Sequence, residues 1–422
     1  MKRKKKFAFL VIAALLWTDI GYADIIMKNI GGNLSYTRYP YNLCDVKSTH
    51  RYFFPSLDCR NNPQYVMTLM HESTYKRRTI CLYKLEDLCQ LEQNSIRPVF
   101  TYPAHGKSKG PGAYNALETP VAFFSGLFFL AKTKTHSSIY KINTSSENIS
   151  TVSFYHDNEF PVYVDKTYDG VAYAKNNIIY RENHNSLYSD RIISDDILSF
   201  HLPRNKYFAV SYYTKDHNPD ILLTVNNRQI PFNNTKINEL NPKFSQDLAH
   251  VAFFRNQPND QYSWELVVYR TASMNRESMD SGLIKSIPDI EIYDSEELAF
   301  SFYDSFQWVQ NKLYYKKSKN PSRQPLIYQY NPVSRLENKL ILSKGVHTWN
   351  IKHTSRNGKP KLLPSKYQIN IKQLGWFQVA HQNNGLIVIA ECNIETQHRL
   401  GDQTNDRNKL VKRILVFREK NH

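Results

Sequence analysis

The chain has 422 residues, and its 55 Lys and Arg residues against 38 Asp and Glu residues give a formal net charge of +17. Hydrophobic residues make up 41% and aromatic residues 13%, as in globular proteins, which excludes a disordered tail or a collagen-like fibre. Because the length exceeds that of a usual single domain, we expect either two domains or one large repeat architecture.

The first 23 residues have the order of a secretory signal peptide. Residues 2–6 are basic, residues 7–17 are apolar, and small residues at positions 21 and 23 precede the expected cleavage after Ala23. The apolar run is shorter than the ~20 residues that a membrane-spanning helix needs, although an uncleaved anchor remains the alternative. We therefore expect a periplasmic or secreted protein, with residues 24–422 as a single domain without a transmembrane segment. Its net charge would be +13.

Four of the five cysteines, Cys44, Cys59, Cys81 and Cys89, lie close together in the N-terminal part of this domain, at about 40–95. An oxidising compartment favours disulfides there, and short loops favour Cys44–Cys59 with Cys81–Cys89 among the three possible pairings. A zinc site is the alternative, but no CxxC pair or histidine at ligand spacing supports it, so we expect no metal. Cys392 lies in an apolar run and is interpreted as a buried free thiol.

Seven stretches of the chain share one order: a turn with Asp, Asn or Gly, an apolar strand, a polar loop and a second strand. The strand pairs are expected at 65–70 with 79–83, 126–131 with 138–142, 170–175 with 178–180, 206–211 with 220–225, 249–254 with 264–270, 311–316 with 325–330, and 385–390 with 410–417. Their starts lie 36 to 74 residues apart. Propeller blades usually recur every ~40–50 residues, so the outer copies require insertions.

The predicted fold class is all-β, because the strands are short, β-branched and aromatic, with turn residues between them. A short helix near 294–300 is the exception. A four-stranded blade cannot bury both faces alone, whereas a closed ring covers every face and leaves only short edges. We predict a β-propeller of six or seven four-stranded blades, with seven favoured, over the alternative of two β-sandwiches.

One stretch carries a family resemblance. Phe244-Ser-Gln-Asp-Leu-Ala-His-Val-Ala-Phe253, followed by Glu265-Leu-Val-Val-Tyr269, resembles the repeat of TolB-like, WD40-like (PD40-type) β-propellers of the bacterial periplasm or secretome. That repeat reads approximately Phe-Ser-Pro-Asp-Gly-x-x-Ile-Ala-Phe, then Glu-Leu-Tyr-Val. Here Gln246 replaces the turn Pro and Leu248 replaces the turn Gly. The resemblance implies a propeller that binds partner proteins without catalysis, although related repeats also occur in peptidases and polyuronate lyases.

No catalytic motif is evident in the sequence. The pattern Gly-x-Ser-x-Gly occurs only within the glycine-rich run at 106–112, as Gly106-Lys-Ser-Lys-Gly110, and this run lacks the strand-to-helix context of a nucleophile elbow or of a phosphate loop. A lyase or glycosidase would need carboxylates or histidines that converge near the ring's axis. The candidates are His156, Asp157, Asp165, His201, Asp216, His217, Asp247 and His250, and each is interpreted as a turn, surface or core residue. We expect no cofactor, and the non-enzymatic interpretation is favoured.

The charge is unevenly distributed along the chain. Residues 310–372 contain 11 Lys and 3 Arg against one acid, Glu337, a net charge of +13, while residues 277–304 contain eight acids and one Lys. Cations interleaved with aromatic rings suit an anionic polymer, and a solvated outer face is the alternative. The candidate polyanion ligands are Lys316, Lys317, Lys319, Arg323, Lys352, Arg356, Lys359, Lys361 and Trp349.

Two functional hypotheses follow. The first is a secreted or periplasmic, non-enzymatic propeller that binds a protein partner. The second is binding, or less readily cleavage, of an anionic envelope or host glycan, or of another polyanion, through residues 310–372. Nucleic acid is not an expected partner of a protein outside the cytoplasm.

Overall fold

The computed structural model describes a set of segments that hold the strands and the turns between them. These are residues 25–29, 50–58, 61–72, 77–86, 99–102, 124–125, 127–132, 136–144, 148–156, 163–167, 170–175, 178–181, 197–204, 206–214, 219–232, 237–257, 260–274, 282–290, 305–317, 326–341, 346–354, 360–382, 385–398 and 409–419. The expected signal peptide and the helix expected near 294–300 lie outside the described residues.

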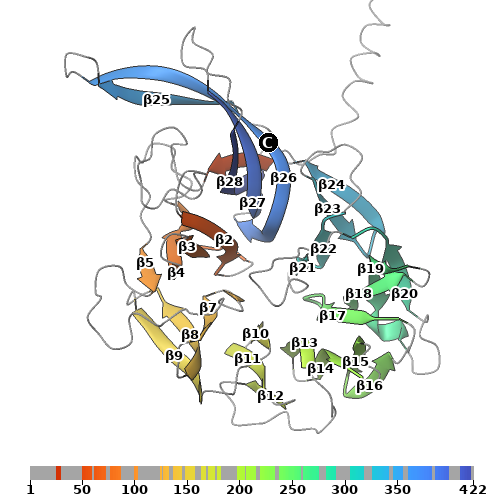
Figure 1. The fold of residues 1–422 in the computed structure, drawn as a ribbon. Helices are drawn as coiled ribbons and strands as arrows, with labels where there is room; N and C mark the ends of the chain where they lie inside the picture. Colours follow the sequence, from red (N-terminus) through yellow and green to blue (C-terminus); the bar gives the residue numbers. More distant parts are fainter. Residues whose placement is uncertain are drawn as a thin grey trace, which may run out of the picture.

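The described strands form seven antiparallel sheets, which follow one another in chain order around a ring (Figure 1). We number the sheets as blades 1 to 7. Blade 1 contains β2 (His50–Leu57), β3 (Tyr65–Glu72), β4 (Arg77–Lys84) and β5 (Phe100–Tyr102); blade 2 contains β6 (Phe124–Ser125), β7 (Phe128–Lys132), β8 (His136–Asn143) and β9 (Asn148–His156); blade 3 contains β10 (Tyr163–Thr167), β11 (Gly170–Lys175) and β12 (Ile178–Arg181).

The next three blades have four strands each. Blade 4 contains β13 (Ile197–Arg204), β14 (Tyr207–Tyr213), β15 (Pro219–Val225) and β16 (Arg228–Phe232); blade 5 contains β17 (Glu239–Phe244), β18 (His250–Gln257), β19 (Asp260–Arg270) and β20 (Leu283–Ile287), with a 3₁₀ turn at Thr271–Ser273; blade 6 contains β21 (Phe306–Val309), β22 (Lys312–Tyr315), β23 (Leu326–Asn331) and β24 (Leu336–Ile341). In Figure 1, β10, β17 and β21 lie nearest the centre of the ring, and β9, β16 and β20 lie outermost.

Blade 7 joins the two ends of the described chain. It contains β25 (Val346–Thr354), β26 (Pro360–Gln382), β27 (Gly385–His398), β28 (Lys409–Glu419) and β1 (Ile25–Asn29), in the order β1-β28-β27-β26-β25. All five residues of β1 pair with β28, from Ile25 opposite Glu419 to Asn29 opposite Leu415. The first described strand therefore forms the outer edge of the last blade and closes the ring.

These sheets confirm the predicted all-β propeller. In each of the seven expected strand pairs, the two strands are hydrogen-bonded neighbours in one sheet: β3 with β4, β7 with β8, β11 with β12, β14 with β15, β18 with β19, β22 with β23, and β27 with β28. The first strand of each blade, the closing strand β1 and the length of β26 are not among the predictions.

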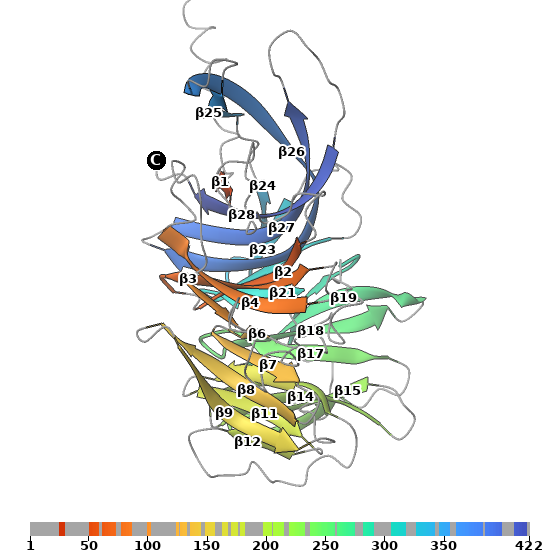
Figure 2. The ribbon, with the colours of Figure 1, turned by 60° about the vertical axis from the view of Figure 1, so that its left-hand side comes forward.

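Part of blade 7 extends beyond the ring. β25 pairs with Pro360–Gln368 of β26. Residues 367–371 of β26 pair with residues 394–398 at the end of β27. Figures 1 and 2 show this part of the sheet projecting away from the other blades. We call it the arm, defined as β25, residues 360–371 of β26, residues 394–398 of β27 and residues 409–411 of β28.

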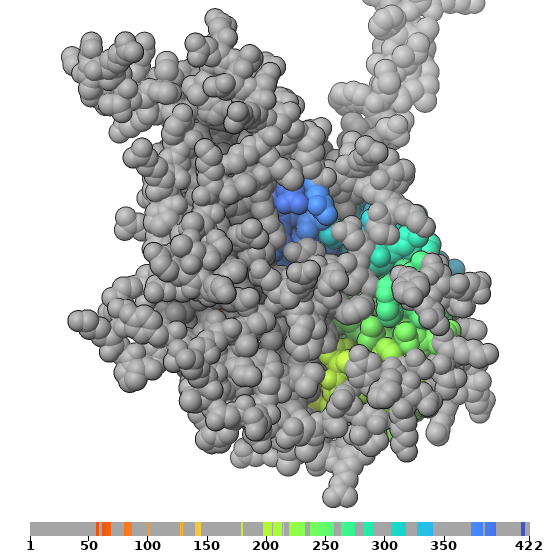
Figure 3. All heavy atoms as spheres, in the orientation of Figure 1, coloured from red at the N-terminus to blue at the C-terminus, as the bar shows by residue number. Residues whose placement is uncertain are grey.

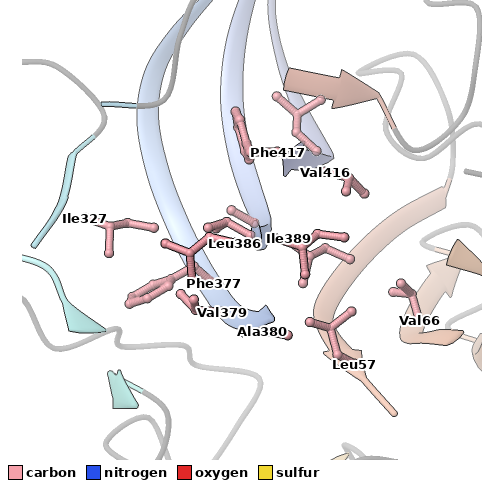
Figure 4. Close-up of a cluster of buried hydrophobic side chains, with 14 of the residues drawn as sticks. Leu57, Val66, Ile327, Phe377, Val379, Ala380, Leu386, Ile389, Val416 and Phe417 are labelled. Carbon is pink, nitrogen blue, oxygen red and sulfur yellow. The ribbon is translucent and has the colours of Figure 1, made fainter. Parts of the chain in front are cut away.

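The core is a set of apolar layers between neighbouring blades. One cluster joins Leu57 and Val66 of blade 1 to Phe377 and Ile389 of blade 7 and to Ile327 of blade 6 (Figure 4). A second cluster lies between blades 4 and 5, and a third between blades 5 and 6. In the space-filling view, the described residues of blades 4 to 7 follow one another in an arc across the face shown (Figure 3).

The turn in the TolB-like stretch explains its sequence pattern. Ser245 Oγ donates to Asp247 Oδ1 at 2.6 Å and accepts from the His250 N–H at 3.0 Å, so both side chains hold the turn. Leu248, at the position of the usual Gly, has φ +63°, a left-handed conformation that glycine adopts without strain. Its side chain is buried in the cluster between blades 4 and 5, which accounts for a leucine there.

Gln246, at the position of the usual Pro, connects this turn to the next blade. Its Oε1 accepts from the Gln310 N–H at 3.2 Å, and Asn311 Oδ1 accepts from the Asp247 N–H at 2.9 Å. Gln310 and Asn311 both have positive φ, as a tight turn between β21 and β22 requires. The departure from proline therefore adds a side chain that bonds blade 5 to blade 6.

Candidate functional site

Lys316, a predicted polyanion ligand, lies inside the protein. Its side chain is only 3% exposed, and its Nζ donates to the Leu374 carbonyl at 2.8 Å. Because Leu374 belongs to β26, this ammonium group bonds blade 6 to blade 7. A buried and hydrogen-bonded ammonium group cannot reach a polymer at the surface, so the prediction for Lys316 is wrong.

Lys317 lies nearer the surface, where its charge is matched by the single acid of the basic segment. Its Nζ is 2.7 Å from Glu337 Oε1 and lies 4.5 Å from the centre of the Tyr328 ring. Tyr315 donates its hydroxyl hydrogen to Glu337 Oε2 at 2.6 Å. Burial raises the pKa of Glu337, but the hydrogen bonds from Lys317 and Tyr315 outweigh it and the net shift is downward. Lys317 is thus paired before any ligand arrives.

These two lysines give a matched prediction. We expect Lys316→Met to lower the free energy of unfolding by about 1–3 kcal/mol, since it leaves the buried Leu374 carbonyl without this donor. Lys317→Met removes a partly exposed ion pair and should cost about 0–1 kcal/mol. Urea unfolding of the two variants beside the wild type measures the difference, and equal losses would contradict the assignment.

The tyrosines of the basic segment are core residues rather than a stacking platform. Tyr314, Tyr315, Tyr328 and Tyr330 are all less than 5% exposed. Tyr314 packs in the cluster that includes blade 7, and the other three pack between blades 5 and 6. These four rings are therefore not available to an anionic polymer, contrary to what the interleaving of cations and aromatic rings suggested.

Three of the remaining polyanion candidates lie in blade 7. Trp349 and Lys352 are in β25 and Lys361 is in the facing part of β26, where Trp349 pairs with Ser365 and Lys361 with His353. These three candidates therefore share the arm. Four others lie outside the described residues: Lys319, Arg323, Arg356 and Lys359. The described part of the segment 310–372 thus divides between blades 6 and 7.

Polar side chains of the inner strands bond one blade to the next. His201 of β13 accepts the Phe244 N–H on Nδ1 at 3.0 Å, which joins blade 4 to blade 5. Trp308 of β21 donates its ring N–H to the Lys243 carbonyl at 2.9 Å, which joins blade 6 to blade 5. The Lys243 Nζ lies 3.4 Å from the Phe306 carbonyl and over the Phe306 ring.

The same arrangement continues through blade 7 to blade 1. Gln307 of β21 donates to the Phe377 carbonyl at 2.6 Å and accepts from the Val379 N–H at 3.0 Å, so its amide pairs with β26 as a strand would. Gln378 accepts from the Leu57 N–H at 2.8 Å, which joins blade 7 to blade 1. These amides were not predicted from the sequence.

Three of the catalytic candidates have described side chains, and all three support the fold. His201 and Asp247 accept the hydrogen bonds given above. His250 stacks on Trp308 with ring centres 6.3 Å apart, and burial lowers its pKa. Asp247 is thus a turn residue and His250 a core residue, as interpreted, whereas His201 is a half-buried strand residue.

A buried row of charged residues crosses blade 5. Glu239, Arg255 and Glu265 stand directly opposite one another on β17, β18 and β19. Arg255 Nε is 2.6 Å from Glu265 Oε1, and Ser286 Oγ donates to Glu265 Oε2. The guanidinium is thus bonded to Glu265, and Glu239 keeps one buried oxygen, Oε2, without a hydrogen-bond partner.

Asp220 of blade 4 adds a second carboxyl group to this region. It is 3% exposed, and its Oδ1 is buried without a hydrogen-bond partner. Burial raises the pKa of Asp220 to about 6. Burial and the negative charge of Asp220 raise the pKa of Glu239 well above its ordinary value, against the opposing effect of Arg255. The sequence carries no signal for this pair, because its members come from different blades.

The carboxyl pair predicts a pH dependence of stability. A carboxyl group whose pKa is raised by folding binds its proton more tightly in the folded state, so the free energy of unfolding falls as the pH rises. For Asp220 the free energy of unfolding should fall between pH 3.8 and about pH 6, and for Glu239 the fall should begin near pH 4.5. The double variant Asp220→Asn with Glu239→Gln lacks this pH dependence. Its free energy of unfolding should therefore rise relative to that of the wild type by about 1–3 kcal/mol as the pH goes from ~4 to ~8.

Urea unfolding of this double variant across that pH range tests the prediction. Glu86→Gln, at an exposed position in blade 1, is the matched control and should follow the wild-type curve. A double variant that runs parallel to the wild type at every pH would show that the pair does not take up protons on folding.

Cys81 is a fully buried free thiol in β4, and burial raises its pKa to about 12. The favoured Cys81–Cys89 disulfide is therefore absent from the structure, because the Cys81 side chain packs in the core cluster that joins blades 1 and 7. Cys44, Cys59 and Cys89 lie outside the described residues. Cys392 is buried, as expected, and its thiol lies 3.8 Å from the Ala390 carbonyl.

Among the described residues, no group of three or more His, Cys, Asp or Glu side chains is placed to hold a metal ion. No helix in the same part of the chain is long and apolar enough to cross a membrane. The features left as candidates for function are the arm and the surface of the ring.

Comparison with known proteins finds similarity in structure alone. No family model and no curated protein matches the chain. Similar solved structures include Saccharomyces cerevisiae Sqt1, with 11% identity, coverage of 94% of this chain and 100% of that chain, and a TM-score of 0.42. The β-propeller domain of Myceliophteria thermophila Cps50 has 11% identity, 72% and 98% coverage and a TM-score of 0.34. Acinetobacter baumannii TolB has 12% identity, 70% and 55% coverage and a TM-score of 0.33.

The ring of sheets and its closure by β1 define the class of the molecule. It is a β-propeller, as the sequence analysis predicts.

Proposed function

We propose that the protein is a secreted or periplasmic β-propeller that acts by binding a protein partner, without catalysis of its own. The observation that carries this proposal is that polar side chains of the inner strands form hydrogen bonds to neighbouring blades. His201, Lys243, Gln307 and Gln378 are the kind of groups that a propeller enzyme would direct at a substrate, and here each is bonded to a neighbouring blade. The TolB-like turn of blade 5 and the expected signal peptide support the same assignment.

The test uses the mature chain, residues 24–422, as bait in periplasmic and host extracts. We expect one protein in stoichiometric amount, retained at high salt and recovered as a defined complex on size exclusion. A bait that lacks β1 is the matched control and should lose the complex with the closed ring. Recovery of no stoichiometric partner from either extract would refute the proposal. N-terminal sequencing of the exported protein tests the location, and the expected first residue is Asp24.

A second candidate function is the binding of a polyanion by the arm. The observation that favours it is a run of 53 residues, 338–390, without Asp or Glu, which includes β25 and all of β26. Charge reversal at Lys352, Lys361 and Lys366 should abolish binding of a soluble polyanion such as dextran sulfate, and binding by the wild type should weaken steeply as salt rises. Lys339→Glu, at an exposed position in blade 6, is the control for net charge. Unchanged binding by the arm variant would exclude this function.

A further inference from the structure

Blades 4 to 6 place their turns side by side at one end of their strands. Each of these sheets runs in chain order, so its first-to-second and third-to-fourth connections lie at the same end. In blade 4 the Asn227 N–H donates to the Lys206 carbonyl at 3.3 Å, which joins the two turns. Tyr207 packs edge-on against Phe244 of blade 5, with ring centres 5.7 Å apart. The hydrogen bonds between the first turns of blades 5 and 6 continue the row.

The exposed charges of these turns are almost all positive. Five basic side chains are exposed there: Arg204, Lys206 and Arg228 in blade 4, Arg270 in blade 5 and Arg335 in blade 6. We call these five residues the basic turn surface. Among the described residues of the same turns, Asp247 is the one exposed acid, and its Oδ1 already accepts from Ser245 Oγ and from the Ala249 N–H.

The charges of the basic turn surface are not neutralised within the described part of the chain. None of its five residues forms an ion pair with a described acid. Glu337 follows Arg335 closely in sequence, but its carboxylate is bonded to Lys317 and Tyr315. Like charges that gather on one surface repel each other, and an anionic partner would remove that cost. The surface is therefore complementary in charge to an acidic partner.

Two apolar side chains lie in the same turn as Arg335. Val333 and Leu336 are 79% and 62% exposed, and among the described residues they are the exposed large hydrophobic side chains. Asn331 Oδ1 accepts from the Val333 N–H at 3.0 Å and holds the turn. A hydrophilic polyanion would leave both side chains in water, and a second copy of this surface would bring like charges together. A protein segment supplies carboxylates and apolar side chains together.

We propose that the basic turn surface binds an acidic segment of the protein partner, and that Val333 and Leu336 contact an apolar side chain of the same segment. This inference rests on the proposed function and names the surface and the chemistry of the partner. Exposed charges act mainly on the rate of association and on the choice of partner. A complex that is also held by apolar contacts therefore forms faster at low salt and still persists at high salt.

Fluorescence anisotropy with labelled peptides tests the proposal on the mature protein. The probe is Glu-Glu-Leu-Glu-Glu-Leu-Glu-Glu, and two comparison peptides replace every Glu by Gln or every Leu by Ser. We expect the probe to bind more tightly than either comparison peptide. Lys206→Glu with Arg228→Glu should weaken binding of the probe about tenfold or more, because two attractions become repulsions.

A matched variant controls for net charge. Lys84→Glu with Lys339→Glu makes the same change of charge at exposed positions in blades 1 and 6, outside the basic turn surface. It should bind the probe within about twofold of the wild type, since salt screens charges that lie far from the site. Thermal unfolding of each variant establishes that the ring is intact, so that a loss of binding is not a loss of folding.

The apolar contact has its own readout. Val333→Ser with Leu336→Ser should weaken binding of the probe about threefold or more, given the free energy of burying such side chains. The same variant should bind the peptide of Glu and Ser as the wild type does, because that peptide has no apolar side chain to lose. An equal effect on both peptides would contradict the assigned contact.

The capture of a partner from extracts distinguishes failure of this inference from failure of the proposed function. A partner retained equally by the wild-type bait and by the Lys206 and Arg228 variant would leave the proposed function standing and refute this surface. Recovery of no partner by the wild-type bait would refute the proposed function itself. Equal binding of the probe and the Gln peptide, binding of dextran sulfate alone that this variant loses, or a dimer of the free protein that it dissociates would each refute the acidic segment.

Discussion

Deletion of residues 24–29 is expected to lower the free energy of unfolding by about 3–5 kcal/mol. The reason is that all five residues of β1 pair with β28, and no other described strand completes that edge of blade 7. Without β1 the ring loses its closing strand, and β28 becomes an open edge that invites pairing with another molecule. Urea unfolding with size-exclusion chromatography measures both effects.

A circular permutant tests whether the pairing of β1 with β28, rather than the length of the chain, accounts for the stability lost in the deletion. Ile25 stands opposite Glu419, so the two ends of the closing pair lie side by side. A permutant that joins residue 422 to residue 24, with new termini between β12 and β13, makes β28 and β1 a hairpin. It should regain the stability that the deletion loses. A deletion variant as stable as the wild type would show that β1 does not close the ring.

Gln307→Leu should cost about 2–4 kcal/mol, the second large effect that we expect. Gln307 is 2% exposed, and its amide satisfies both the Phe377 carbonyl and the Val379 N–H of β26. Leucine has a similar size but leaves two buried backbone groups unpaired at the seam between blades 6 and 7. Urea unfolding at neutral pH measures the loss.

Gln307→Glu distinguishes this hydrogen-bonding role from simple packing. The ionised carboxylate accepts from Val379 but cannot donate to the Phe377 carbonyl, whereas the protonated carboxyl group can do both. Burial favours the protonated form, so this variant should gain stability relative to the wild type as the pH falls. A Glu variant with the same pH profile as the wild type would contradict the assigned pair of bonds.

The middle strands of the blades were predictable because both of their faces are buried between neighbouring blades. Val251, Ala252 and Phe253 are all fully buried, and such a run of apolar residues is visible in the sequence. The first strands were not predictable. β17 contains Asn241 and Pro242 and a break in register between Leu240 and Lys243, since its inner edge faces the axis and needs no ladder partner.

The candidate site was predicted less well, for a reason visible in Lys316 and Lys317. Adjacent residues at a strand end point in opposite directions, so one ammonium group lies in the core and its neighbour lies near solvent. A count of charges along the chain does not distinguish the buried ammonium group from the one near solvent. The bonds of Gln307 and Gln378 span 70 and 321 residues, and no local pattern marks an amide that pairs with so distant a backbone.

The pairing of β1 with β28 also sets the order in which the molecule can be completed. The strands that seal the ring lie at residues 25–29 and 409–419, so a ribosome must synthesise nearly the whole chain before closure is possible. Contacts this distant in sequence slow folding. A chain truncated before residue 409 therefore lacks the partner strand of β1 and cannot close its ring by this pairing.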